Sequence, residues 1–311
     1  MSEPVRLRND RVSVEILPLG ASLHRFEVRL PDGGWRNVVV SRDDPGSTDE
    51  SYLGATVGRL ANRVGDARLT IAGVPYDLAP NEGANQLHGG PGGFSEVVWD
   101  VRSATGDTVV LHLVSPDGDQ GYPGTVDVTA TFSLLDSGAQ VVYAATTDAP
   151  TVVNLTTHPY FILGDATIAD HLVTAPTTHY TPTRAEDLIP TGEILPVDGT
   201  ALDLRGGRVV GELIEAALAE GLARKGGIDQ NFVIDGTGLR EHVRVTGPSG
   251  LTLVVRSDAP ALQLYTAEHL GRTGLAIEPQ GFPDAPNHPA FGSVDLLPGQ
   301  EYSATTQWLV S

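Results

Sequence analysis

Hydrophobic and polar residues alternate along much of this chain with a period of two. Residues 25–30 (RFEVRL) and residues 126–134 (VDVTATFSL) alternate without a break. Successive side chains of a β-strand point to opposite faces, so this pattern predicts strands with one buried and one solvated face. Strands of this kind are typical of antiparallel sheets.

Short turn sequences separate several pairs of such runs. Gly, Pro, Asp and Ser favour the backbone conformations that hairpin connections need. The runs expected to pair across these turns are residues 68–71 with 74–78, residues 97–101 with 108–114, and residues 242–246 with 251–256. The sequence therefore predicts a fold built largely from hairpins.

Helical periodicity is scarce. Residues 209–222 are the best candidate for a short surface helix, because apolar side chains recur there at the spacing of one helix face. No repeat, linker or shift in composition marks a domain boundary. We therefore expect residues 1–311 to form one all-β domain, a large antiparallel β-sandwich with few short helices.

Composition and charge narrow the classes of function. The 311 residues include no Cys, which excludes disulfides, thiolate nucleophiles and Cys-ligated metals. The net charge is -19, and Lys225 is the single lysine. A field of this sign repels nucleic acids and anionic membranes. No apolar run suits a membrane span or a signal peptide, so we expect a cytoplasmic protein with a neutral small-molecule ligand.

Five segments carry side chains with useful chemistry. They are residues 54–64 with Arg59, Asn62 and Arg63, residues 85–94 with His88, residues 154–161 with His158, residues 227–234 with Asp229, and residues 275–288 with Glu278. Histidine exchanges protons near neutral pH, and Arg and Asn bind hydroxyl groups or carboxylates. Each segment also has a structural alternative: an arginine that caps carbonyls, a hydrogen-bonded histidine, or an aspartate in a turn.

The last segment is the most unusual. Glu278 ends an apolar strand, and four prolines follow it within eleven residues. A carboxylate at the buried end of a strand has either a task or a cationic partner. His88 is notable in another way, because the glycines beside it allow the backbone to approach a ligand closely.

Together, these segments resemble the aldose 1-epimerases, or galactose mutarotases. The matching stretches, in the order of the family, are Gly54–Arg63, Leu87–Trp99, Asn154–Phe161, Gln263–Thr266 and Glu278–His288. The resemblance extends from Val12 to Trp308. It implies a galactose mutarotase-like supersandwich with its site in an open cleft, and an enzyme that needs neither a cofactor nor a metal.

The resemblance also implies residue roles. Glu278 matches the general base, His158 the general acid at the ring oxygen, and His88 the second histidine near that oxygen. Positions that bind the sugar hydroxyls are matched by Asn62, Arg63, Asp229 and Gln263.

These residue types suit the interconversion of α and β anomers. A base takes the proton from the C1 hydroxyl, an acid protonates the ring oxygen, and the opened ring closes on its other face. No redox step, nucleophile or electron sink is involved. We expect a free aldose as substrate, galactose or glucose first, acted on by a monomer or homodimer.

Four alternatives stay open. Asp229 and Glu278 could be the carboxylate pair of a glycoside hydrolase. His88, His158 and Glu278 could hold a metal, although their spacing carries no local ligand signature. The chain could be a sugar-binding or regulatory module that has lost the chemistry. It could also be an epimerase for pentoses or for hexose 6-phosphates, the latter needing more cations than Arg63.

Several positions depart from the pattern of the family as we expect it. Thr157 and Pro159 flank His158, and Ala267-Glu268 follow Tyr265-Thr266 where the family often has Gly-Asn. None of them is a proton-transfer residue. We expect these departures to affect substrate preference more than the type of reaction.

Overall fold

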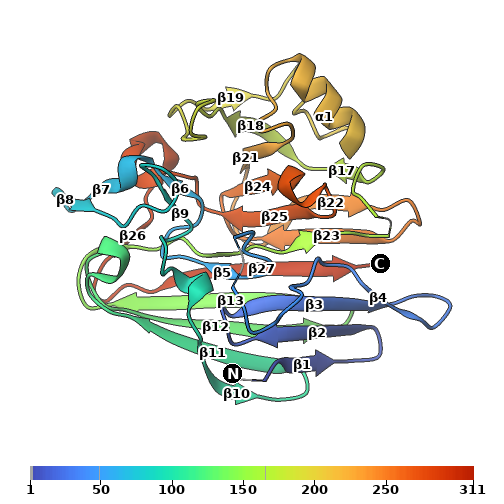
Figure 1. The fold of residues 1–311 in the computed structure, drawn as a ribbon, viewed down its shortest axis with the longest axis horizontal. Coiled ribbons are helices and arrows are strands. Elements are labelled where there is room, and N and C mark those ends of the chain that lie inside the picture. Colours follow the sequence, from blue (N-terminus) through green and yellow to red (C-terminus); the bar gives the residue numbers. More distant parts are fainter. Residues whose placement is uncertain (1–2, 49, 165) are drawn as a thin grey trace.

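The computed structural model describes residues 3–48, 50–164 and 166–311. Its strands form two layers, as the hydrophobic pattern predicts, and its main sheets are antiparallel (Figure 1). One layer is a nine-stranded sheet in the order β10 (Asp100–Ala104), β11 (Thr108–Ser115), β12 (Val126–Leu135), β13 (Gly138–Thr147), β27 (Tyr302–Val310), β23 (Thr252–Ser257), β22 (Arg240–Thr246), β17 (Leu172–Thr174) and β20 (Arg208–Val209).

Two smaller sheets make up the other layer. The four-stranded sheet consists of β1 (Val5–Arg8), β2 (Val12–Leu17), β3 (Ser22–Arg29) and β4 (Trp35–Asn37). The six-stranded sheet has the order β16 (Tyr160–Phe161), β25 (Leu275–Gln280), β24 (Ala261–Tyr265), β21 (Asp229–Ile234), β18 (Thr177–Thr181) and β19 (Leu195–Pro196).

Shorter elements connect these sheets. The two-stranded pairs are β5 (Thr56–Val57) with β15 (Thr156–Thr157), β6 (Arg63–Val64) with β9 (Gln86–Leu87), β7 (Arg68–Ile71) with β8 (Val74–Asp77), and β14 (Thr151–Val152) with β26 (Asp295–Leu296). The 3-10 turns are η1 (Gly65–Ala67), η2 (Phe94–Glu96), η3 (Asp119–Gly121), η4 (Glu268–Leu270), η5 (Ala285–Asn287) and η6 (Pro289–Phe291). Within the described ranges, α1 (Val210–Ala219) is the one α-helix, and no helix there is long and apolar enough to cross a bilayer.

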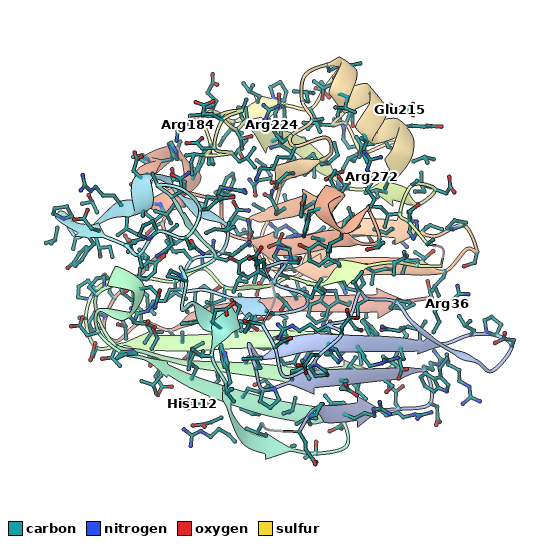
Figure 2. All side chains as sticks on the ribbon, in the orientation of Figure 1. Arg36, His112, Arg184, Glu215, Arg224 and Arg272 are labelled. Atoms are coloured by element: carbon teal, nitrogen blue, oxygen red, sulfur yellow. The ribbon has the colours of Figure 1, made fainter. Side chains whose placement is uncertain are left out.

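The main core lies between the two layers. Phe26 of β3, Phe132 of β12 and Trp308 of β27 are buried there, as are Phe232 of β21 and Ile277 of β25, all in one hydrophobic cluster. Side chains fill the space between the ribbons, and the labelled residues His112 and Glu215 lie near the outline of the molecule (Figure 2). The apolar faces of these strands therefore supply the burial that stabilises the sandwich.

The expected hairpins all form, with one shift in position. The strand expected over residues 97–101 is β10, which begins at Asp100 and continues to Ala104. The indole of Trp99 is buried, and its N–H donates to the carbonyl of Phe94 at 3.1 Å. That anchorage ties residue 99 to the preceding turn, so the strand starts after it.

The predicted helix over residues 209–222 is confirmed as the shorter helix α1. It ends at Ala219, and Gly221 follows with a φ of 71°. A glycine in the left-handed region lets the chain reverse and satisfies terminal carbonyls of the helix. Here the N–H of Leu222 donates to the carbonyl of Ala217 at 2.8 Å.

Buried Arg59 attaches the segment after β5 to the nine-stranded sheet. Its side chain is 2% exposed, and its guanidinium donates to the carbonyls of Ser115, Pro116 and Pro123 at 2.8–3.0 Å. It also donates to the hydroxyl of Ser115 at 2.9 Å. This is the carbonyl-capping role that the sequence left open for an arginine here. The anchored segment leads directly to Asn62 and Arg63.

We predict that Arg59→Met lowers the free energy of unfolding by about 3 kcal/mol or more, because several buried acceptors lose their donor. Urea unfolding measures this loss. Arg68→Met is the control, since Arg68 is exposed and its pair with Asp77 is worth at most about 1 kcal/mol. Equal stabilities of the two variants would contradict the anchoring role of Arg59.

Candidate active site

A cavity of about 240 Å³ lies beside the six-stranded sheet, where loops from distant parts of the chain converge. Its lining residues are Glu50, Ser51, Tyr52, Asn62, Arg63, Glu82, Leu87, His88, His158, Tyr160, Lys225, Asp229, Tyr265, His269 and Glu278. Six of the seven residues expected at the site therefore meet in one cavity. The seventh, Gln263, reaches the site through Asp229.

Strand register places the acidic side of the cavity. Glu278 lies in β25, whose six residues are all buried, and it stands opposite Gln263 of β24. Asp229 begins β21 on the other side of β24, opposite Tyr265. The amide of Gln263 donates to the Asp229 carboxylate at 2.5 Å. These neighbouring strands hold both carboxylates on rigid backbone.

His158 is held by hydrogen bonds on both sides of its peptide backbone. Its N–H donates to the carbonyl of Ala55, and its carbonyl accepts from Gly54, each at 2.9 Å. The preceding Thr157 points away from the chemistry, because its hydroxyl bonds to the buried Tyr143 at 2.7 Å. The departure from the family pattern at Thr157 is therefore absorbed by packing.

His88 is fixed by a reciprocal pair of hydrogen bonds with Asn62. The N–H of His88 donates to the Asn62 carbonyl at 2.9 Å, and the N–H of Asn62 donates to Nδ1 of His88 at 3.1 Å. Since Nδ1 accepts a hydrogen bond, the neutral ring carries its proton on Nε2. His88 therefore offers an N–H, and not a lone pair, through its other nitrogen.

Aromatic rings form one wall of the cavity. The rings of His88 and His158 meet edge to face, with centroids 5.1 Å apart. Tyr52 packs against His88 at 4.6 Å, and Tyr160 packs against His158 at 4.9 Å. Sequence reasoning missed Tyr52, which lies in a polar loop. These rings cover much of His88 and His158, which are 5% and 4% exposed.

Glu278 and His158 face each other at the floor of the cavity. Oε1 of Glu278 lies 3.4 Å from Nε2 of His158, and both side chains are almost fully buried. Oε2 of Glu278 and Nδ1 of His158 have no hydrogen-bond partner among the described residues. Buried polar atoms without partners are costly, so a ligand that supplies hydrogen bonds would be favoured here.

Burial shifts the pKa values of this pair in opposite directions. It raises the pKa of Glu278 well above its ordinary value, and the nearby Asp229 carboxylate adds to that shift. Burial lowers the pKa of His158 to about 3. It also lowers the pKa of His88 well below the ordinary value, and the adjacent His158 and Arg63 contribute. The dry site thus disfavours charge on each of these groups.

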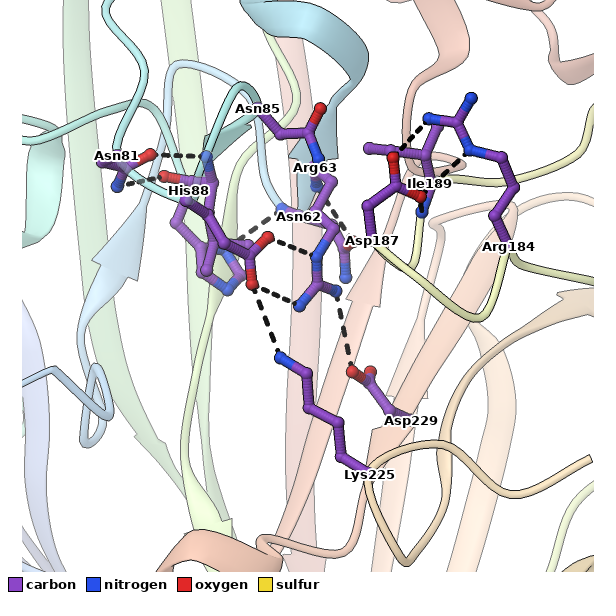
Figure 3. Close-up of polar contacts among 12 residues, drawn as sticks. Asn62, Arg63, Asn81, Asn85, His88, Arg184, Asp187, Ile189, Lys225 and Asp229 are labelled. Atoms are coloured by element: carbon purple, nitrogen blue, oxygen red, sulfur yellow. Dashed lines mark hydrogen bonds and ion pairs between the residues drawn. The ribbon is translucent and has the colours of Figure 1, made fainter.

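A network of ion pairs around Arg63 forms another part of the cavity lining (Figure 3). Arg63 donates two hydrogen bonds to the carboxylate of Glu82, at 2.6 and 2.9 Å, and lies 3.6 Å from Asp229. Nζ of Lys225 lies 3.8 Å from the same Glu82 carboxylate. Sequence reasoning missed Glu82, because its Pro-Asn-Glu-Gly surroundings are typical of a solvated turn.

The two histidines and the glutamate are close enough to raise the question of a metal. Ligand atoms of His88, His158 and Glu278 all lie within 4.8 Å of one another. In the tautomer described above, however, Nδ1 of His88 accepts a hydrogen bond and Nε2 carries a proton. Neither nitrogen offers a free lone pair, and a metal ligand needs one. The geometry therefore fits acid–base chemistry better than a metal centre.

Comparison with known proteins agrees with this geometry. The chain matches the family model for aldose 1-epimerase over residues 3–308. It is 37% identical to a galactose mutarotase from Bos taurus, with 98% of this chain and 92% of the relative covered. It is 34% identical to an aldose 1-epimerase from Escherichia coli (strain K12), with 98% and 95% covered.

Solved structures show the same fold. A homologue of aldose epimerase from C. elegans superposes with a TM-score of 0.91 at 27% identity, covering 100% of this chain and 99% of that one. A galactose 1-epimerase from Lactobacillus acidophilus NCFM gives 0.85 at 28% identity, covering 98% and 93%. With these matches across nearly its whole length, the chain belongs to the aldose 1-epimerase family.

Proposed function

We propose that this protein interconverts the α and β anomers of a free, uncharged aldose by general acid–base catalysis. The observation that carries the proposal is the buried contact between Glu278 and His158, 3.4 Å apart at the floor of the cavity. The names of the relatives, galactose mutarotase and aldose 1-epimerase, support the same reaction.

In this mechanism, Glu278 and His158 act on opposite ends of the hemiacetal. Ionised Glu278 takes the proton of the C1 hydroxyl, while protonated His158 gives a proton to the ring oxygen. The bond between C1 and the ring oxygen breaks, and C1 becomes an aldehyde. Rotation about the bond between C1 and C2 exposes the other face, and the ring closes with both proton transfers reversed.

Burial helps the ring-opening step. The charged pair is ionised Glu278 with protonated His158, and the uncharged pair is protonated Glu278 with neutral His158. The two pairs hold the same number of protons. Ring opening converts the charged arrangement into the uncharged one, which a dry cavity favours. Closing the ring reverses both proton transfers, so the pair holds the same number of protons before and after turnover, which needs no proton from solvent. In the free enzyme burial favours the uncharged arrangement, and a shift of the Glu278 proton to Nε2 of His158, 3.4 Å away, gives the charged arrangement that opens the ring.

The other site residues bind and orient the sugar. His88 donates its Nε2 proton as a hydrogen bond near the ring oxygen, since its tautomer is set by the backbone of Asn62. Asp229 and Arg63 bind sugar hydroxyls, and Gln263 fixes the Asp229 carboxylate. An acceptor beside a donor suits hydroxyl groups, which both give and receive hydrogen bonds.

Charge favours a neutral sugar over a phosphorylated one. Both formal cations among the described lining residues, Arg63 and Lys225, already pair with the carboxylate of Glu82. A phosphate would have to compete with that carboxylate and approach Asp229 and Glu50 as well. Galactose and glucose are therefore the first candidates, ahead of hexose 6-phosphates.

Glu278→Gln is expected to lower kcat by at least ~10², because the amide cannot accept the proton of the C1 hydroxyl. His158→Asn is expected to lower kcat similarly. NMR exchange between the α and β signals of galactose measures both effects. Near-normal exchange in Glu278→Gln would refute the assignment of the base. Wild-type protein that binds galactose without exchanging its anomers would instead be a binding module.

The uncharged state of His158 has a pH signature. Its lowered pKa means that, between pH 6.5 and about 3, the unfolded chain binds a proton that the folded chain does not. Titration of His158 therefore leaves the free energy of unfolding unchanged above pH 6.5 and lowers it as the pH falls from 6.5 toward 3. From pH 7.5 to pH 4.5, wild-type protein should lose ~2 kcal/mol more than His158→Asn. If urea unfolding shows the same loss of stability in wild type and His158→Asn over this pH range, the lowered pKa of His158 is contradicted.

Arg63→Ala is expected to raise KM for galactose about tenfold, because it removes binding shared by the ground state and the transition state. Steady-state kinetics by polarimetry measures this change. Arg68→Ala is the matched control, since Arg68 lies outside the cavity and is 66% exposed at its side chain. An unchanged KM in Arg63→Ala would show that this arginine only supports the loop.

A further inference from the structure

We propose that Glu268 is a positioning residue for the sugar-binding carboxylate Asp229. Glu268 stands where the sequence departs from the family pattern, and it is not among the described residues that line the cavity. It acts instead on the backbone segment that leads into Asp229. The proposal rests on the proposed role of Asp229 in binding sugar hydroxyls.

Two residues close to Glu268 in the sequence, Thr266 and Arg272, contact its carboxylate. The hydroxyl of Thr266 donates to Oε1 at 2.5 Å, and Nε of Arg272 lies 3.4 Å from the same oxygen. The side chain is 15% exposed, so most of it is packed against protein. Glu268 thereby orients both Thr266 and Arg272.

Thr266 and Arg272 in turn hold the backbone just before Asp229. The N–H of Ile228 donates to Oγ1 of Thr266, and the N–H of Thr266 donates to the carbonyl of Ile228, each at 2.9 Å. Nη2 of Arg272 donates to the carbonyl of Gly226 at 3.1 Å. Residues 226–228 are therefore attached at both ends to the segment from Thr266 to Arg272; Figure 2 labels Arg272 below helix α1.

Glu268 also covers Gly227 directly. A Cβ atom at position 227 would lie 1.6 Å from Oε1 and 1.9 Å from Cδ of Glu268, so no side chain fits there while Glu268 is in place. The φ angle of Gly227 lies outside the left-handed region. A side chain at this position would therefore displace the Glu268 carboxylate, and it is this carboxylate, not the backbone conformation, that limits the space.

Two sets of contacts position Asp229, one on its carboxylate and one on the backbone that precedes it. Gln263 and Arg63 contact its carboxylate, whereas the Glu268 contacts fix the path of the chain that delivers it. Loss of Glu268 should therefore weaken sugar binding and leave the Glu278–His158 pair intact. Its effect belongs in KM and not in kcat, because binding of the hydroxyls is shared by ground state and transition state.

The first test compares substitutions of Glu268. Glu268→Ala is expected to raise KM for galactose about tenfold with kcat within about twofold, whereas Glu268→Gln, which keeps an acceptor for Thr266, should restore most of the affinity. Glu241→Ala is the control, since it removes an exposed glutamate that pairs with Arg244 on β22. Unchanged KM in Glu268→Ala, or an equal fall in kcat, would overturn the proposal.

The second test uses the glycine. Gly227→Ala must expel the Glu268 carboxylate, so it should raise KM as much as Glu268→Ala does. In the double variant Glu268→Ala/Gly227→Ala the new Cβ has room, and KM should equal that of Glu268→Ala alone. Additive effects of the two substitutions would overturn the proposal, because they would show independent action. If Glu268→Ala does not fold, Gly227→Ala and Glu268→Gln supply the comparison.

A third measurement asks whether Glu268 acts through Asp229 and does not depend on turnover. Galactose affinity is measured by NMR line broadening in wild type, Glu268→Ala, Asp229→Asn and the double variant. Glu268→Ala should weaken binding about tenfold in wild type and little further in Asp229→Asn. An equal further loss in Asp229→Asn would overturn the proposal. Failure of wild-type protein to exchange anomers would refute the proposed function instead, and the two failures are thus distinguishable.

Discussion

The contact between Glu278 and His158 depends on keeping two ionisable groups dry and close, and much of the fold serves that requirement. Burial alone would leave both groups uncharged, as their opposite pKa shifts indicate. The contact persists because neither group sits on a free loop. Glu278 belongs to a wholly buried strand, and His158 is held on both sides by the segment that begins at Gly54. Buried Arg59 fixes that segment to Ser115 of the nine-stranded sheet, so an interaction outside the cavity helps to keep Glu278 and His158 in register.

The charges around the cavity are balanced locally. Arg63 lies between the carboxylates of Glu82 and Asp229, and Lys225 adds a second positive charge to Glu82. Such pairs are costly to break when they are partly buried, because the remaining charge would be left without a partner. The result is a polar wall with little attraction for charged ligands and many donors and acceptors for neutral ones.

Regular alternation made the strands and the sandwich predictable from the sequence, because the period of two reports directly which face is buried. It could not show where β10 begins, since that depends on the buried Trp99. The motif residues His88 and Asn62 were recognised, but their shared hydrogen bonds, which fix the tautomer, arise only when two loops meet. Glu82 and Tyr52 were missed because their sequence surroundings look like solvated turns, and only the tertiary fold brings them to the cavity.

The single lysine has a practical consequence for anyone who handles this protein. Lys225 lines the mouth of the cavity, and its side chain is 64% exposed. Reagents that couple through amines, such as those used to attach proteins to resins or to fluorescent dyes, would have this one side chain as their target, besides the α-amine of the chain. Coupling there would place the support or the dye at the entrance to the cavity. Attachment through the 39 acidic residues would instead be spread over many positions, and only four of those that the structure describes line the cavity.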